Sequence, residues 1–97
     1  MGAYYSPQNH PIVLGRDRFT RHASDKFGLL RVYGFKLSQD EVLDTIKAPD
    51  YTERRGAQTI SRKVLDDKFA LTVVHEERKG IIEVITFYPV KRKEHGL

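Results

Sequence analysis

Three segments in the second half of the chain have the composition of β-strands and are separated by short links. They are rich in β-branched and aromatic residues and comprise residues 59–65, 69–76 and 80–88. Asp66 and Asp67 suit a tight turn and Gly80 offers another, so consecutive segments can be joined as hairpins. The sequence therefore predicts an antiparallel meander, with residues 51–55 as a weaker fourth strand.

Two helices are expected before this meander. Apolar residues at helical spacing predict the first helix from Phe19 to about Arg31, and these residues are Phe19, Ala23, Phe27 and Leu30. The second helix is predicted from Gln39 to Lys47, because Ser38 and Glu41 have the spacing of a capping box. The fold class that follows is α+β, with two N-terminal helices packed on one face of a three- to four-stranded antiparallel sheet.

The chain has 97 residues, which is enough for one domain with a single modest core. The predicted parts of this domain, residues 1–97, are an N-terminal arm (1–18), a core (19–89) and a basic tail (90–97). The arm contains a candidate edge strand at Ile12–Leu14. Pro89 is expected to end the last strand, because proline cannot donate a hydrogen bond to a strand ladder.

The formal net charge is +4, and the second half of the chain holds the excess, with ten Lys and Arg against seven Asp and Glu. This charge favours a polyanionic partner, although it also serves ordinary solubility. Cysteine is absent, which excludes disulfides and thiolate metal sites. The sequence has no apolar stretch of membrane-spanning length and no apolar secretion signal, so we expect a cytoplasmic protein without a membrane partner.

Three motifs occur in a fixed order: "RHASDKF", then "LSQDEVLDTIKAPD", then a long strand region that ends in "TFYP". Their order, over Phe19 to Pro89, resembles the prokaryotic domain-of-unknown-function family 4258, which is similar in pattern to the RelE/ParE toxins and to related ribonuclease-like folds. The resemblance implies a RelE-like fold and a toxin-antitoxin setting. It also implies RNA and an antitoxin-like protein as partners.

Two residues are candidates for metal-independent cleavage of RNA, which needs proton transfer and cations that stabilise the charged phosphate. His22 is the candidate general acid or base, because an imidazole titrates near neutral pH. Arg62 is the candidate phosphate clamp, because a guanidinium can bond two oxygens at once. The alternatives are a hydrogen-bonded structural histidine and an arginine that only covers apolar surface with its stem.

Thr86 and Tyr88 complete the candidate catalytic set, because residues two apart in a strand share a face. Tyr88 could donate a proton or stack on a base, with Thr86 as its helper. Strand propensity alone also explains both residues. The predicted RNA-binding cations are Lys63, Lys91, Arg92 and Lys93.

Two functional hypotheses follow from these residues. The first is a metal-independent endoribonuclease, and the second is a noncatalytic module that binds RNA or protein, so the sequence leaves open whether the chain is an enzyme. No cofactor or metal is expected, because the four histidines lack metal-ligand spacing and no glycine-rich phosphate loop is present.

Overall fold

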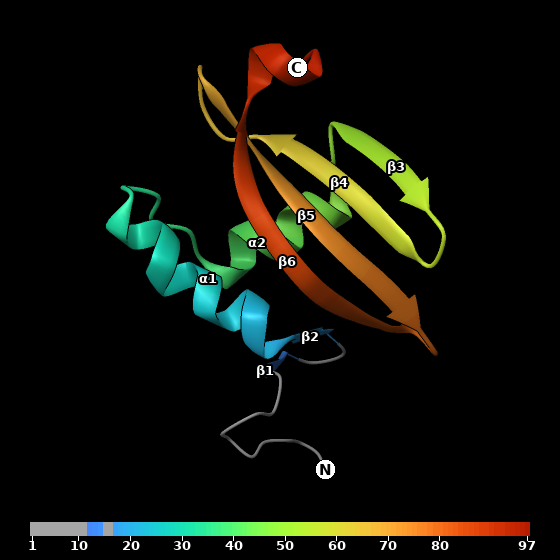
Figure 1. Ribbon diagram of the computed structural model, residues 1–97. Coiled ribbons are helices and arrows are strands. Elements are labelled where there is room, and N and C mark those ends of the chain that lie inside the picture. The colour runs from blue at the N-terminus through green and yellow to red at the C-terminus, as the bar shows by residue number, and fades with distance from the viewer. Residues whose placement is uncertain (1–11, 15–16) are drawn as a thin grey trace.

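The computed structural model describes residues 12–14 and 17–97, which form one sheet with two helices beside it (Figure 1). The elements in chain order are β1 (Ile12–Leu14), β2 (Asp17–Phe19), α1 (Arg21–Val32), α2 (Gln39–Lys47), β3 (Tyr51–Arg55), β4 (Gln58–Val64), β5 (Phe69–Arg78), β6 (Ile81–Lys91) and the 3-10 helix η1 (Arg92–His95). The sheet has six strands in the order β1-β2-β6-β5-β4-β3.

Strands β3 to β6 form the antiparallel meander that the sequence predicts. Its register is regular from β3 to β5 and shifts once between β5 and β6, where Val74 pairs with Thr86 and His75 with Val84. Ile85 is therefore the extra residue of a β-bulge.

The predicted fold class is wrong in the N-terminal part of the sheet. Strand β2 pairs in parallel with β6, so that Phe19 lies opposite Val84, and β1 pairs with β2 at the edge. The sheet is consequently mixed rather than antiparallel, and strands precede the helices. Sequence patterns miss β2 because it has only three residues, two of them charged, and because Phe19 fits the apolar spacing of the helix that follows.

Both helices pack on the same face of the sheet. Helix α1 contacts β6 and β2, α2 contacts β5 and β4, and in Figure 1 α2 crosses behind β5 and β6. Phe27 lies between Phe19 and Phe87, with ring centroids 5.7 and 4.7 Å apart respectively. The fully buried or nearly buried core comprises Phe19, Ala23, Leu30, Val42, Leu43, Leu71, Val73, Val84 and Phe87. We call the other face of the sheet, which neither helix covers, the open face.

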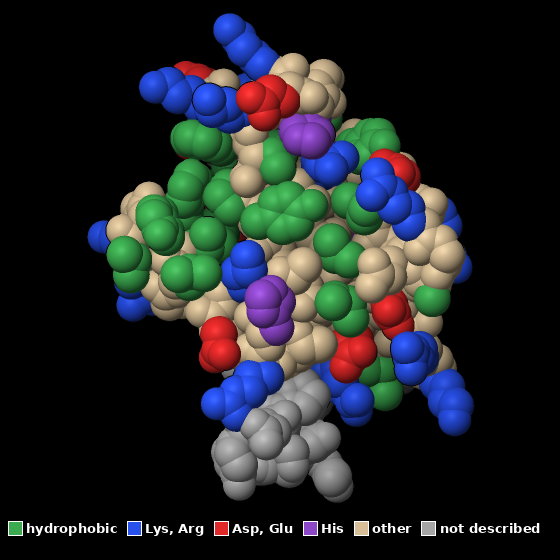
Figure 2. Space-filling model, in the orientation of Figure 1, with side chains coloured by type: hydrophobic (Ala, Val, Ile, Leu, Met, Phe, Trp, Pro, Cys, Tyr) green, Lys and Arg blue, Asp and Glu red, His purple; other side chains and the backbone are tan. Residues whose placement is uncertain are grey.

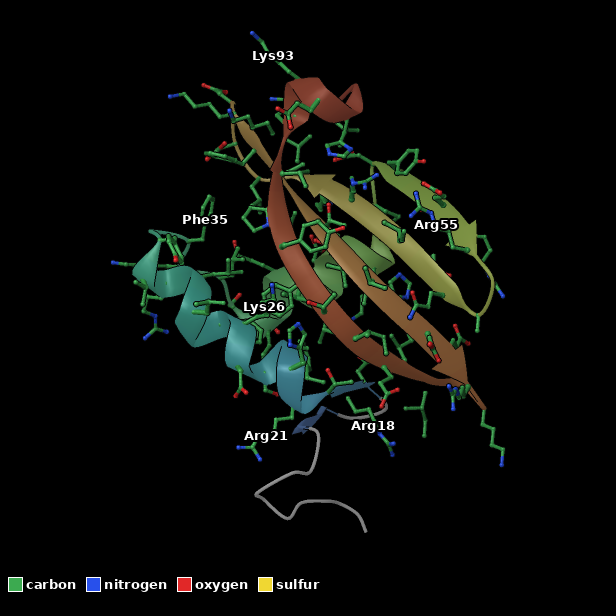
Figure 3. The ribbon with its side chains drawn as sticks, viewed as in Figure 1. Arg18, Arg21, Lys26, Phe35, Arg55 and Lys93 are labelled. Carbon is green, nitrogen blue, oxygen red and sulfur yellow. The ribbon has the colours of Figure 1, made fainter. Side chains whose placement is uncertain are left out.

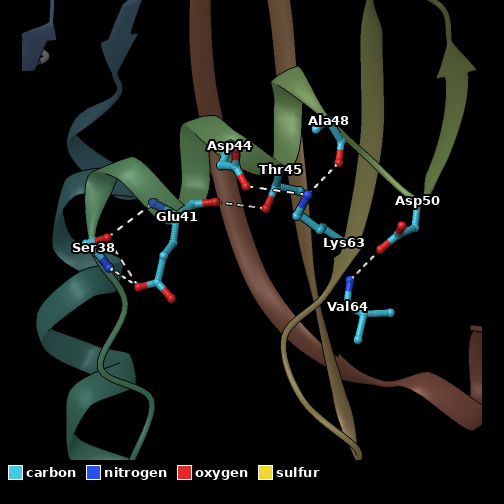
Figure 4. A network of polar contacts seen from close by, with 8 residues as sticks. All are labelled: Ser38, Glu41, Asp44, Thr45, Ala48, Asp50, Lys63 and Val64. Atoms are coloured by element: carbon cyan, nitrogen blue, oxygen red, sulfur yellow. Dashed lines mark hydrogen bonds and ion pairs between the residues drawn. The ribbon is translucent and has the colours of Figure 1, made fainter.

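Side-chain caps set where the helices begin. The Thr20 hydroxyl accepts a hydrogen bond from the Ala23 N–H (3.1 Å), so α1 begins after Thr20 and not at Phe19 as predicted. Helix α2 has its predicted bounds, and the capping box of Ser38 and Glu41 is confirmed (Figure 4). No helix in residues 17–97 is both long enough and apolar enough to cross a membrane.

The C-terminal residues form the end of β6 and the 3-10 helix η1. Strand β6 continues through Pro89, which pairs with Leu71, to Lys91, so the prediction that Pro89 ends the strand is wrong. The physical reason is that β2 flanks β6 only at residues 82–84, and proline is tolerated where one side of a strand has no neighbour. Arg92 stabilises the position of η1, because its guanidinium donates hydrogen bonds to the carbonyls of Asp66 and Leu97, each at 3.2 Å.

Candidate functional site

Four residues, one from each strand of the meander, stand side by side on the open face. Tyr51 is paired with Arg62, Arg62 with Thr72, and Thr72 with Tyr88. Directly opposite residues of paired strands project to the same face. Their chain neighbours Val73 and Phe87 point into the helix-covered core, so these four side chains point away from it. We call Tyr51, Arg62, Thr72 and Tyr88 the transverse row.

Arg62 is held in place within this row. Its Nε donates to the Thr72 hydroxyl at 3.0 Å, and its guanidinium carbon lies 5.3 Å from the centre of the Tyr51 ring. The two terminal nitrogens make no hydrogen bond or ion pair with any residue in the described part of the chain. A guanidinium fixed in this way can donate two parallel hydrogen bonds to one phosphate group.

A carboxylate stands beside the row on β3. Glu53 accepts a hydrogen bond from the Tyr51 hydroxyl (2.8 Å) and another from Arg55 Nε (2.6 Å). These bonds, that from Arg55 first, lower the pKa of Glu53, and the bond to Glu53 raises the pKa of the Tyr51 phenol. Glu53 is therefore an ionised carboxylate with a fixed orientation. Tyr51, Glu53 and Arg55 were not predicted as site residues, although their alternation in "YTERR" places all three on one face of a strand.

Thr86 shares the open face with Tyr88, as the spacing predicts. It pairs with Val74, two residues along the strands from the transverse row. Its hydroxyl oxygen is buried and has no hydrogen-bond partner among residues 17–97. Figure 2 shows the surroundings: apolar and aromatic side chains gather over the middle of the sheet, with charged side chains around them.

His22 does not join Arg62. It is exposed in the first turn of α1, which is fixed beside β6 by the bond from Thr20 N to the Val84 carbonyl (3.0 Å). Lys26, one turn later on the same side of α1, reaches toward β6 (Figure 3). Arg62 lies on β4, roughly 10 Å further across the sheet at the usual strand spacing. Convergence of His22, Arg62, Thr86 and Tyr88 on one phosphate stays a prediction.

The predicted RNA-binding cations lie in different places. Lys63 is on the helix-covered face, where its ammonium group donates to the Ala48 carbonyl (2.9 Å) and lies 3.4 Å from Asp44 (Figure 4). Arg92 is occupied by two backbone carbonyls. Lys91 and Lys93 are exposed, and Figure 3 shows Lys93 directed outward from η1.

A second polar pair lies on the helix-covered face, and no local sequence pattern predicts it, because its two residues are 14 positions apart on neighbouring strands. Ser61 Oγ and His75 Nε2 are 2.9 Å apart, with 1% and 8% of the two residues exposed. Burial lowers the pKa of His75, so the ring is held in its neutral form. A pair this enclosed has a structural role.

The described residues contain no cluster of three or more His, Asp or Glu side chains that could hold a metal ion. Comparison with family models, curated proteins and solved structures gave no match, so the resemblance to family 4258 and to the RelE/ParE toxins stays a prediction. The open face offers two aromatic rings, one directed guanidinium and one ionised carboxylate. Such a surface can stack on planar groups and bind a phosphate.

Proposed function

We propose that this protein binds single-stranded RNA across the open face of its sheet. The observation that carries the proposal is the transverse row, in which Arg62 is fixed by Thr72 and Tyr51 while its terminal nitrogens have no partner in the described residues. Aromatic side chains on an uncovered sheet stack on unpaired bases, and arginine bonds the backbone between them. Tyr51, with 39% of its surface exposed, and the half-buried Tyr88 supply the rings.

The spacing of the row supports a single strand as the ligand. Three strand spacings separate Tyr51 from Tyr88, which is roughly 14 Å. An extended single strand can place unpaired bases on two rings at such an interval, whereas the bases of a duplex are hidden in its interior. The exposed Lys91 and Lys93 add attraction to the backbone.

Binding is tested with a fluorescein-labelled ten-nucleotide RNA by anisotropy at low salt. Losing one base stack costs roughly 1 to 3 kcal/mol, so Tyr88→Leu should weaken binding by about 5- to 150-fold. Arg62→Ala should weaken it as well, and Arg62→Lys should not restore it, because lysine keeps the charge but loses the paired donors.

Arg31→Ala is the matched control, because it removes the same charge from an exposed position on the outer side of α1. Equal affinities of Arg62→Ala and Arg31→Ala would contradict the proposal, since binding would then depend on net charge alone. A wild-type protein that does not bind the RNA at low salt would contradict it too.

RNA cleavage is a second candidate, favoured by one observation: Tyr88 and Arg62 lie on the same face in the same row, with Thr72 between them. The argument against it is that His22 lies on α1, which packs on β6 and β2, whereas Arg62 lies on β4. The test is to incubate labelled RNA with wild type, His22→Ala and Tyr88→Phe in EDTA. Loss of an acid or base group typically slows cleavage by about 10²- to 10⁴-fold, and absence of products with all three proteins leaves binding alone.

A further inference from the structure

Glu53 is an unexpected group on a surface that binds RNA, because a carboxylate repels phosphates. It lies on β3 in the same face as the transverse row, next to the ring of Tyr51. Its pKa is lowered, so it keeps its negative charge at neutral pH. A negative charge in this place suits a ligand group that donates hydrogen bonds, and in RNA those groups are the ribose 2′-hydroxyls and the edges of the bases, of which only the base edges differ between nucleotides.

The hydrogen bonds of Glu53 leave part of its capacity unused. An ionised carboxylate has about four acceptor positions. In the described residues one oxygen accepts from Tyr51 and the other from Arg55, at 2.8 and 2.6 Å, so each oxygen keeps one position for a ligand. The two bonds also fix the plane of the carboxylate. The group is therefore prepared for two donors side by side.

We infer that Glu53 selects guanine in the bound RNA, by accepting hydrogen bonds from the N1–H and the exocyclic N2 amino group of a base stacked beside Tyr51. This inference rests on the proposed RNA binding. Guanine presents these two donors next to each other on its Watson–Crick edge. Adenine and cytosine present one amino group beside an acceptor nitrogen, and uracil presents one N–H between two carbonyls, which face the carboxylate unfavourably.

The arrangement on β3 explains why this position can read a base. Arg62 covers one side of the Tyr51 ring, and its guanidinium is available to the phosphate of the same nucleotide. Arg55 neutralises Glu53 without occupying it fully, so the carboxylate does not repel the backbone strongly. Stacking, phosphate binding and edge recognition would then come from three neighbouring side chains: Tyr51, Arg62 and Glu53.

The experiment compares four heptamers that differ only in the central base of an oligouridine: G, inosine, A and U. Inosine keeps the N1–H of guanine but lacks the N2 amino group. A well-placed pair of base contacts discriminates by roughly 5- to 150-fold, so wild type should bind the G heptamer that much more tightly than the A and U heptamers, with inosine between them. Anisotropy at fixed low salt gives the four dissociation constants.

Glu53→Gln should remove the preference while keeping the size of the side chain. Its binding to the U heptamer should be equal to wild type or tighter, because a negative charge is lost. Glu94→Gln, which makes the same charge change at an exposed position on η1, should keep the preference for G.

Three results would overturn the inference. Equal binding of the four heptamers by wild type overturns it alone and leaves the proposed RNA binding intact. If Glu53→Gln weakens all four heptamers by the same factor, Glu53 only positions Tyr51 and Arg55. If wild type binds no heptamer, the proposed function fails and this inference fails with it. Because the first result needs only the wild-type protein, the test does not depend on the folding of the variant.

Discussion

Replacing His75 by glutamine tests how the buried pair with Ser61 responds to acid. The imidazole is 8% exposed and its Nε2 lies 2.9 Å from the Ser61 hydroxyl, so the native protein holds the ring neutral. Burial is the main cause of the lowered pKa, and the nearby charge of Glu77 opposes it in part. Glutamine can keep a hydrogen bond to Ser61 but cannot titrate in this range.

The direction of the effect follows from where protons bind. In the unfolded chain His75 has the ordinary histidine pKa of about 6.5. Below that value the unfolded chain takes up a proton that the native protein does not, so the free energy of unfolding falls as the pH falls, until the native pKa is reached. One group contributes at most about 1.4 kcal/mol per pH unit, which gives a ceiling of about 2 kcal/mol between pH 6.5 and pH 5.

The assay is urea denaturation at several pH values from 7.5 to 5, in wild type, His75→Gln and His22→Gln. Wild type and His22→Gln should lose stability together below pH 6.5, because the His22 substitution leaves the buried pair of Ser61 and His75 unchanged. His75→Gln should give a flatter curve over the same range. Identical slopes in wild type and His75→Gln would refute the reasoning, since another group would then be responsible. Carboxylates with lowered pKa, such as Asp66, act below this range.

Three further predictions concern stability. Ser38→Ala removes both hydroxyl bonds of the α2 capping box and should lower the free energy of unfolding by about 1 kcal/mol in urea titrations; an unchanged value would show that the cap is not needed. Thr86→Val replaces a buried hydroxyl that lacks a partner in the described residues by a methyl group, so the thermal midpoint should rise, and a fall would contradict the assignment. Gly28→Ala, inside α1 with open space around it, should raise the free energy of unfolding by about 0.5 to 1 kcal/mol. Gly34→Ala, at a φ of +92°, should lower it, and urea titrations that show the same sign for both variants would contradict this prediction.

The helices and the meander could be predicted because their signals are local. The second helix needs only Ser38, Glu41 and an apolar stripe within nine residues, and the strands from β3 to β6 follow one another through short turns. Strand β2 could not be predicted in this way. Its three residues form a strand because they pair with β6, which lies more than sixty positions later in the chain. In this pairing Phe19 lies opposite Val84.

The candidate site also has one part that local sequence patterns predict and another part that they do not. Alternation along one strand correctly separates Arg62 from Lys63 and places Thr86 with Tyr88. The transverse row depends on the register between strands. Turn lengths and bulges determine this register, so it cannot be predicted from the sequence of one strand alone. The contact between α1 and β6 is likewise long-range, and no local pattern around His22 contains it.

Two polar side chains of the open face, Arg62 and Thr86, keep hydrogen-bonding groups that no described residue uses. On the helix-covered face, Ser61 bonds His75, and Lys63 bonds the Ala48 carbonyl. On the open face, Arg62 uses only Nε within the described residues, and the buried Thr86 hydroxyl uses nothing. A buried hydroxyl without a partner costs about 1 to 3 kcal/mol, and valine would fit a strand at that position without this cost. Stability alone therefore does not explain the Thr86 hydroxyl, and the terminal nitrogens of Arg62 are the groups to which the proposed RNA ligand would supply oxygens.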